Sequence, residues 1–192
     1  MKKIYGMLTL LTISSIVYGT EFSADFLMKA GGISTSGRMF FGQNKFRMDM
    51  NVPQKITTIT LLDKKEVINI MHEQKIYMVM PFDPQNKPKV EERLEGEIER
   101  KKVGTEVIDG HPTIKYLITC KTNNEKQEFY QWFADDIKLP LKIEARDGSW
   151  SQEFKNVKMG KVPDSVFEIP AGYRKVEIPI VPRGGINLPV QP

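Results

Sequence analysis

The sequence has very little of the side chains on which most catalytic and metal sites depend. Its 192 residues include one cysteine, Cys120, and two histidines, His72 and His111. A single cysteine excludes an intramolecular disulfide, so packing must hold the fold together. The histidines lack partners at metal-ligand spacing, and no nucleophile elbow, glycine-rich phosphate loop or zinc motif is present. We therefore expect a protein that is not an enzyme and has no cofactor and no metal.

The few polar candidates have structural interpretations. His111 follows the turn dipeptide Asp109-Gly110, and His72 ends an apolar strand pattern. Asp135 and Asp136 are adjacent, so as strand residues they would face opposite sides of a sheet, and in a loop they would be capping or solvated groups. Cys120 lies in an alternating apolar run that predicts a buried, unreactive thiol.

The charge is weak and mixed. There are 28 basic and 24 acidic side chains, and the formal net charge is only +4. Proteins that bind nucleic acid usually concentrate a strong basic surplus on one face or helix. We therefore expect no nucleic-acid partner.

The N-terminus has the layout of a signal peptide. Lys2 and Lys3 precede an apolar run from Ile4 to Val17, and Gly19 ends a cleavage-site pattern. The alternatives are an uncleaved anchor or the first helix of a cytoplasmic protein. No cysteine near Gly19 could accept a lipid anchor, and no second segment is long enough to cross a membrane. We expect residues 1–19 to be removed and the mature chain, without a transmembrane segment, to reach the periplasm.

The mature chain has strand periodicity along most of its length. In the segment 45–51, for example, Phe46, Met48 and Met50 alternate with polar residues, which predicts one apolar face. Turn dipeptides such as Asp109-Gly110 separate consecutive runs. The pattern predicts about 11 antiparallel strands, at residues 22–30, 35–42, 45–51, 55–63, 66–72, 75–80, 101–108, 112–121, 126–134, 139–146 and 149–158.

Two segments break this pattern. Residues 81–89 hold three prolines, which do not fit a central strand, and residues 90–100 are rich in helix formers. Val90, Leu94 and Ile98 recur at four-residue spacing, so we expect a short amphipathic helix there. The proline-rich tail, residues 177–192, is expected to be extended.

Methionine is the positive signal for function. Eight methionines follow the expected signal peptide, and most lie on the apolar sides of consecutive strands. Methionine is flexible and polarisable, and it is common on surfaces that accept ligands of variable shape. The alternative is that these residues fill an ordinary closed core. We predict a hydrophobic ligand-binding pocket lined by Phe46, Met48, Met50, Ile76, Met78 and Met80.

Several stretches together resemble a known family. The run from Phe22 to Asp49, the segment 103–116 with its pattern G-x-E-x-x-x-G-x-x-x-x-K-Y, and the closing segment 163–173 (PDSVFEIPAGY) carry the resemblance. With Trp132 and the stretches 139–142 and 153–157, they resemble an uncharacterised secreted bacterial family. That family is a domain of unknown function in the LolA/LolB-like superfamily of lipoprotein localisation factors.

The resemblance implies a mainly β (α+β) fold for residues 20–176. In this LolA/LolB-like fold, a strongly curved antiparallel half-barrel wraps around a short helical plug, and a cavity between them takes lipid or lipoprotein acyl chains. A dedicated lipoprotein carrier usually has a longer helix before its first strand. Here the plug must come from residues 81–100, which predicts a shallower cavity.

Three hypotheses for function follow. The first is a non-catalytic periplasmic carrier or binding protein for lipid, an acylated lipoprotein or another amphiphile. The second is an envelope sensor that uses the same fold to bind a protein partner, for which the tail after Glu177 offers a docking segment. The third is a closed domain without a ligand.

Overall fold

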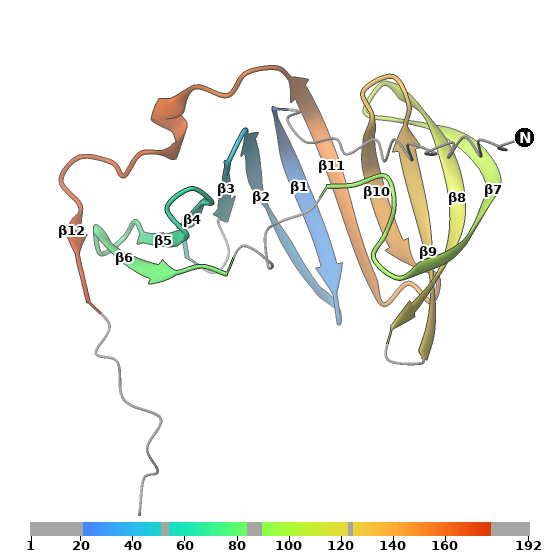
Figure 1. Cartoon of the computed structure of the whole chain (residues 1–192), viewed down its shortest axis with the longest axis horizontal. Coiled ribbons are helices and arrows are strands. Elements are labelled where there is room, and N and C mark those ends of the chain that lie inside the picture. Colours follow the sequence, from blue (N-terminus) through green and yellow to red (C-terminus); the bar gives the residue numbers. More distant parts are fainter. Residues whose placement is uncertain (1–20, 51–53, 84–89, 123–124, 178–192) are drawn as a thin grey trace, which may run out of the picture.

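The computed structural model describes residues 21–50, 54–83, 90–122 and 125–177, and nearly all of their regular structure is strand (Figure 1). These residues contain no α-helix and only one short 3₁₀ turn, η2 (Asp164–Phe167). This confirms the predicted curved antiparallel half-barrel, which is not closed. The strands are β1 (Phe22–Ala30), β2 (Ile33–Gly42), β3 (Lys45–Met50), β4 (Ile56–Leu61), β5 (Glu66–Met71), β6 (Ile76–Pro81), β7 (Glu97–Ile108), β8 (His111–Thr122), β9 (Glu125–Ala134), β10 (Leu139–Ala145), β11 (Trp150–Met159) and β12 (Arg174–Lys175).

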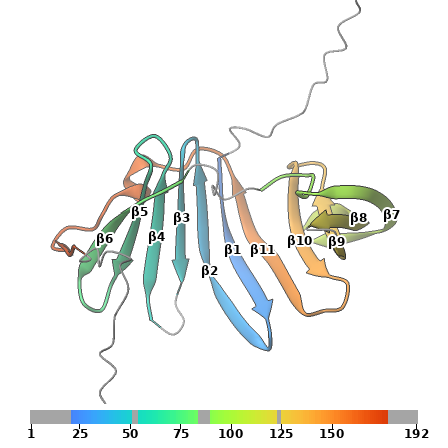
Figure 2. The same cartoon turned by 60° about the horizontal axis from the view of Figure 1, so that its bottom comes forward.

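All twelve strands belong to one sheet. Its order is β12-β6-β5-β4-β3-β2-β1-β11-β10-β9-β8-β7, and Figure 2 shows the strands from β6 to β7 side by side in this order. Two meanders, β1–β6 and β7–β11, are joined where β1 pairs with β11. Every neighbouring pair is antiparallel except β12 with β6. The first and last long strands therefore lie at the centre of the sheet.

The sequence pattern explains these strands well. On β1, Phe22, Ala24 and Phe26 are buried, and the residues between them are half-buried. At the β7–β8 hairpin, Asp109 and Gly110 both have positive φ, as the turn dipeptide predicts. The predicted strands are confirmed with shifts of a few residues at their ends.

The predicted helix over residues 90–100 is wrong. Residues 90–96 form bends and turns, and β7 begins at Glu97 and pairs with β8. Gly96 has a φ of 72°, which lies outside the right-handed helical region. Ile98, expected on the apolar side of the helix, is 56% exposed. Helix propensity is a weak preference, and pairing with a long neighbouring strand overrides it.

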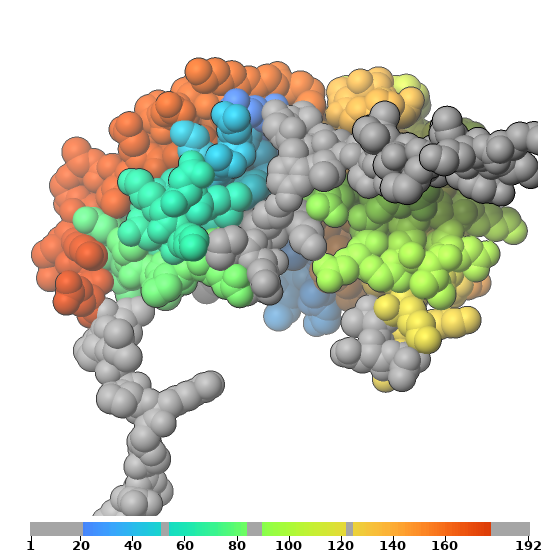
Figure 3. Space-filling view, viewed as in Figure 1, coloured from blue at the N-terminus to red at the C-terminus, as the bar shows by residue number. Residues whose placement is uncertain are grey.

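The two faces of β3–β6 are buried by different means. On one face, three isoleucines pack against Val162 and Phe167 of the segment 160–173, which we call the strap. These isoleucines are Ile59, Ile68 and Ile70. Phe167 is part of this buried cluster and is only 6% exposed. Figure 3 shows the described C-terminal residues, in orange and red, along one side of the molecule.

The opposite face is rich in methionine, and we call it the methionine face. Directly paired residues of an antiparallel sheet lie on the same side, so the strand registers define its members. On β1–β6 they include Phe22, Phe26, Met28, Met39, Phe41, Phe46, Met48, Met50, Ile56, Val67, Met71, Ile76, Met78 and Met80. The expected signal peptide, residues 1–19, and most of the tail, residues 178–192, lie outside the described residues.

Candidate functional site

The structure brings the six predicted pocket residues together on one face. Three rows cross β3 to β6 at one residue per strand. The first row runs from Met50 to Ile76, the second from Met48 to Met78, and the third from Phe46 to Met80. Between these end residues, β4 and β5 contribute Ile56 and Met71 to the first row, Thr58 and Asn69 to the second, and Thr60 and Val67 to the third. All six predicted side chains are half-buried.

The methionine face grades from a closed core to a more open surface. Towards the centre of the sheet, Phe46, Met48 and Met50 pack against a buried cluster that includes Phe22 and Phe41. The Phe22 and Phe41 rings stack with centroids 4.5 Å apart. Ile76, Met78 and Met80 on β6 belong to neither buried cluster of the described chain. The apolar side chains at the β6 end are thus half-buried without being part of a buried cluster.

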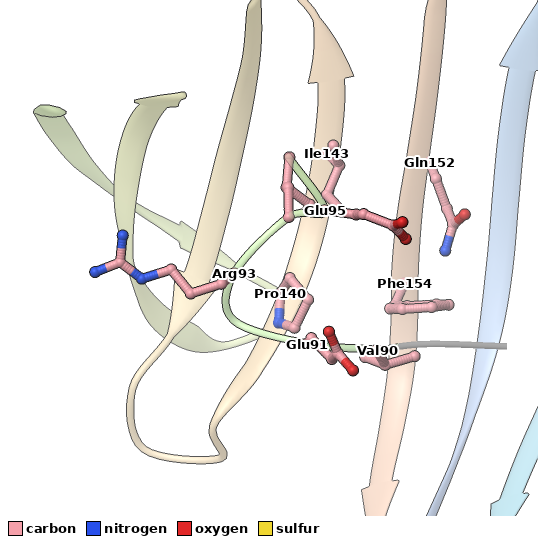
Figure 4. A pocket seen from close by; sticks show the side chains of 9 residues that line it. Val90, Glu91, Arg93, Glu95, Pro140, Ile143, Gln152 and Phe154 are labelled. Atoms are coloured by element: carbon pink, nitrogen blue, oxygen red, sulfur yellow. The ribbon is translucent and has the colours of Figure 1, made fainter. Parts of the chain in front are cut away.

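A cavity of about 230 Å³ lies farther along the same face, and sequence reasoning missed it. The segment 90–95 covers it, and β10 and β11 form its floor. Figure 4 shows Val90 next to Phe154, with the Glu95 carboxylate directed towards Gln152. The lining residues are Val90, Glu91, Arg93, Leu94, Glu95, Pro140, Ile143, Gln152 and Phe154. None of the six predicted residues lines it.

The cavity and the methionines share one face of the sheet. Phe154 on β11 pairs with Phe26 on β1, which pairs with Gly37 on β2, and Gly37 pairs with Met50 on β3. Val90 packs against the same buried cluster as Met50. The helical plug expected from residues 81–100 is not formed by residues 90–95, which cover this face as a loop, and residues 84–89 lie outside the described residues.

A buried charge pair fixes the covering loop to the sheet. The Arg100 guanidinium contacts the Glu97 carboxylate at 2.8 Å, and both side chains are at least nine-tenths buried. Arg100 also donates hydrogen bonds to the Glu92 carbonyl and to Gln131 Oε1. The Arg100 Cζ atom lies 4.7 Å from the Tyr116 ring centroid.

The electrostatics of Glu97 fit this role. Burial raises the pKa of the Glu97 carboxyl, but hydrogen bonds from Arg100, the Leu94 backbone and Arg93 outweigh it and lower that pKa. The carboxylate therefore stays charged and paired. Because a buried pair of this kind holds one geometry, the loop over the cavity is fixed at its C-terminal end.

The histidines have the structural positions expected of them. His72 bonds Thr57 Oγ1 through Nε2 at 2.8 Å and the Tyr173 hydroxyl through Nδ1 at 2.7 Å. Thr57 in turn donates to Asp49. His111 contacts Asp136 at 2.7 Å on the surface. Neither arrangement places an activated nucleophile beside a base.

The described residues offer little for covalent or metal chemistry. No group of three or more His, Cys, Asp and Glu side chains within them could hold a metal ion. Cys120 is a free, buried cysteine, and burial raises the pKa of its thiol. A neutral buried thiol is a weak nucleophile. Within the described ranges, no helix is long and apolar enough to cross a membrane.

Fold and site together define an open, curved antiparallel sheet with an apolar face suited to binding. Residues 25–139 match the family model DUF4412, a domain of unknown function, and the chain belongs to this family. This match agrees with the resemblance, seen in the sequence, to a family of unknown function. No curated protein matches the chain.

Solved structures share the fold at low sequence identity. The structure of the Pseudomonas aeruginosa MucA/MucB complex matches with a TM-score of 0.58 and 13% identity, over 84% of this chain and 59% of that chain. A structure of MucB in complex with MucA(peri) matches with a TM-score of 0.56 and 14% identity, over 83% and 57%. The chain thus spans less than two thirds of these neighbours.

The Mycobacterium tuberculosis lipoprotein LppX is a weaker match. Its TM-score is 0.44 and its identity is 14%, over 72% of this chain and 84% of that chain. This likeness is too low to add to the argument.

Proposed function

We propose that this protein is a non-catalytic carrier in the periplasm, which it reaches after residues 1–19 are removed. Its ligand is the acyl chain of a lipid, of a lipoprotein or of another amphiphile, held on the methionine face. The observation that carries the proposal is the alignment of six half-buried apolar side chains in three rows from β3 to β6.

The size and softness of the surface suit such a ligand. Each CH₂ group that leaves water contributes about 0.8 kcal/mol, so a short stretch of chain provides useful affinity. The cavity of about 230 Å³ under residues 90–95 is a second apolar space on the same face. A carrier must also release its cargo, and flexible methionine side chains adapt to a moving chain more easily than rigid rings.

Charged substitutions in the middle row test the proposal. We expect M48D and M78D to abolish loading, because a carboxylate on the methionine face would have to lose its water when an acyl chain covers it. Loading is measured by fluorescence of an environment-sensitive dye and by displacement with a fatty acid.

The control is V107D on β7, at the opposite edge of the sheet from β6, where the valine is 72% exposed. This variant should load normally. Circular dichroism must show unchanged strand content in all three variants. Normal loading by M48D and M78D, or collapse of their sheet, would refute the assignment of these residues.

A second candidate is an envelope sensor that binds a protein partner. The observation behind it is that the MucB structures sharing this fold were solved with MucA bound. Deleting residues 178–192 tests it. Loss of a partner in pull-down with unchanged dye loading supports the sensor, whereas an unchanged partner profile counts against it.

A further inference from the structure

The methionine face has a polar pair at its centre. Thr58 and Asn69 are directly paired across β4 and β5. Met48 flanks the pair on β3, and Met78 flanks it on β6. Both polar side chains are half-buried. A ligand lying across the middle row must therefore cover them.

The pair has an unused capacity to donate hydrogen bonds. Thr58 Oγ1 donates to Asn69 Oδ1 at 2.9 Å, which leaves the two N–H groups of Asn69 Nδ2 without a partner among the described residues. If the amide is turned over, Nδ2 donates one N–H to Thr58 and keeps the other. In either orientation, at least one donor remains for a ligand.

We infer that the ligand of this face carries an ester-linked acyl chain, whose carbonyl oxygen accepts a hydrogen bond from Asn69. The inference rests on the proposed function and specifies its ligand class. An ester carbonyl accepts hydrogen bonds and has no donor, which complements the free N–H. The acyl chain beyond the ester carbonyl then lies over Met48 or Met78.

The same geometry makes Asn69 a selectivity residue. A plain hydrocarbon would cover the amide and leave its N–H groups without water or partner, which is unfavourable. An ester replaces the lost water with its carbonyl oxygen. The competing interpretation is a cross-strand pair that only stabilises the sheet, and it predicts that replacing Asn69 leaves the relative affinity for the two ligands unchanged.

The experiment compares two probes of equal heavy-atom count, methyl decanoate and tridecane. Each displaces an environment-sensitive naphthylamine dye from the mature protein, residues 20–192. The hydrophobic effect alone favours tridecane, because it buries more CH₂ groups than the ester. We expect the ratio of ester affinity to tridecane affinity to be about three- to tenfold higher in the wild type than in N69L, the effect of one hydrogen bond. N69L should retain tridecane binding.

The control is N44L, which makes the same change in the exposed β2–β3 turn. It should keep the wild-type ratio of affinities. If N69L alters the fold, N69V replaces it, because valine suits a strand, carries no charge and has no N–H donor in its side chain.

The outcomes separate the two proposals. If the wild type binds neither probe, the proposed function fails. A ratio of ester affinity to tridecane affinity that is unchanged in N69L overturns the inference alone. So does a folded N69L that binds neither probe, because the side chain would then shape the face without selecting the ester.

The ester could come from a glycerophospholipid or from an acylated lipoprotein. Competition by phosphatidylglycerol and by a diacylated lipopeptide distinguishes them. Competition by one supports the inference and names the source, and competition by neither overturns it.

Discussion

At the scale of single residues, Gly37 shows how close the packing on the methionine face is. It lies inside β2, directly paired with Phe26. A Cβ built on it would lie 1.9 Å from the Asp49 carbonyl oxygen and 2.8 Å from the Phe26 ring. The Phe26 ring therefore occupies the space that a side chain at this position would need.

We expect G37A to destabilise the protein by about 1–3 kcal/mol, because the core must shift to accept the methyl group. Urea unfolding measures the change. The matched control is G104A on β7, where an added Cβ meets nothing within 4 Å. If both variants lose the same stability, the close contact at Gly37 is not what limits this position.

The sequence predicted the positions of some functional side chains but not of others. The period-two pattern placed Met48 and Met78 on apolar sides of their strands, and the register shows that these sides coincide. It could not find the cavity beside Phe154 or the Arg100–Glu97 pair. Both depend on contacts between segments that are distant in the chain, which local periodicity does not encode.

At the scale of elements, a polar network joins the strap to the sheet. His72 follows β5 and contacts Tyr173 of the strap, while Arg47 on β3 donates to the Val166 carbonyl at 2.6 Å. Burial lowers the pKa of His72, and the charge of Lys55 lowers it further, although Asp49 acts in the opposite direction.

This network makes stability depend on pH. Because the pKa of His72 is lower in the folded state than its ordinary value of 6.5, the unfolded chain takes up a proton first as the pH falls. Stability is therefore full above pH 6.5 and declines as the pH falls towards the folded-state pKa.

We expect the urea midpoint to decrease between pH 7.5 and pH 5.5 and this slope to become smaller in H72Q. A slope unchanged in H72Q would contradict the role given to His72.

Elements differ in how well sequence predicted them. The strands followed from alternation and turn dipeptides, and their positions shifted by only a few residues. The helix expected at residues 90–100 failed because β8 offers a long partner strand, and the extended pairing that starts at Glu97 outweighs local helix preference.

At the scale of the whole molecule, the sheet depends on one pairing between the ends of the chain. β1 and β11 join the two meanders, and β1 also pairs with β2. This contact could not be predicted from hairpin patterns, which connect only neighbouring strands. It brings Phe154 next to Phe26, and so unites the cavity and the methionines on one face.

The edge strand β7 has features that discourage pairing with a strand of another molecule. Its register with β8 shifts twice, between Glu97 and Glu99 and between Lys102 and Gly104. Irregularities and charged side chains at an edge discourage addition of a further strand. The apolar face, and not this edge, is therefore the surface that we assign to binding.

Acyl-chain binding is tested most directly by native mass spectrometry of the protein purified gently from cells, with solvent extraction of bound material. We expect a co-purifying acylated species that is lost on denaturation. A bare protein that also fails to take up an added acyl ester would rule out this function, and the methionines would then be ordinary core residues.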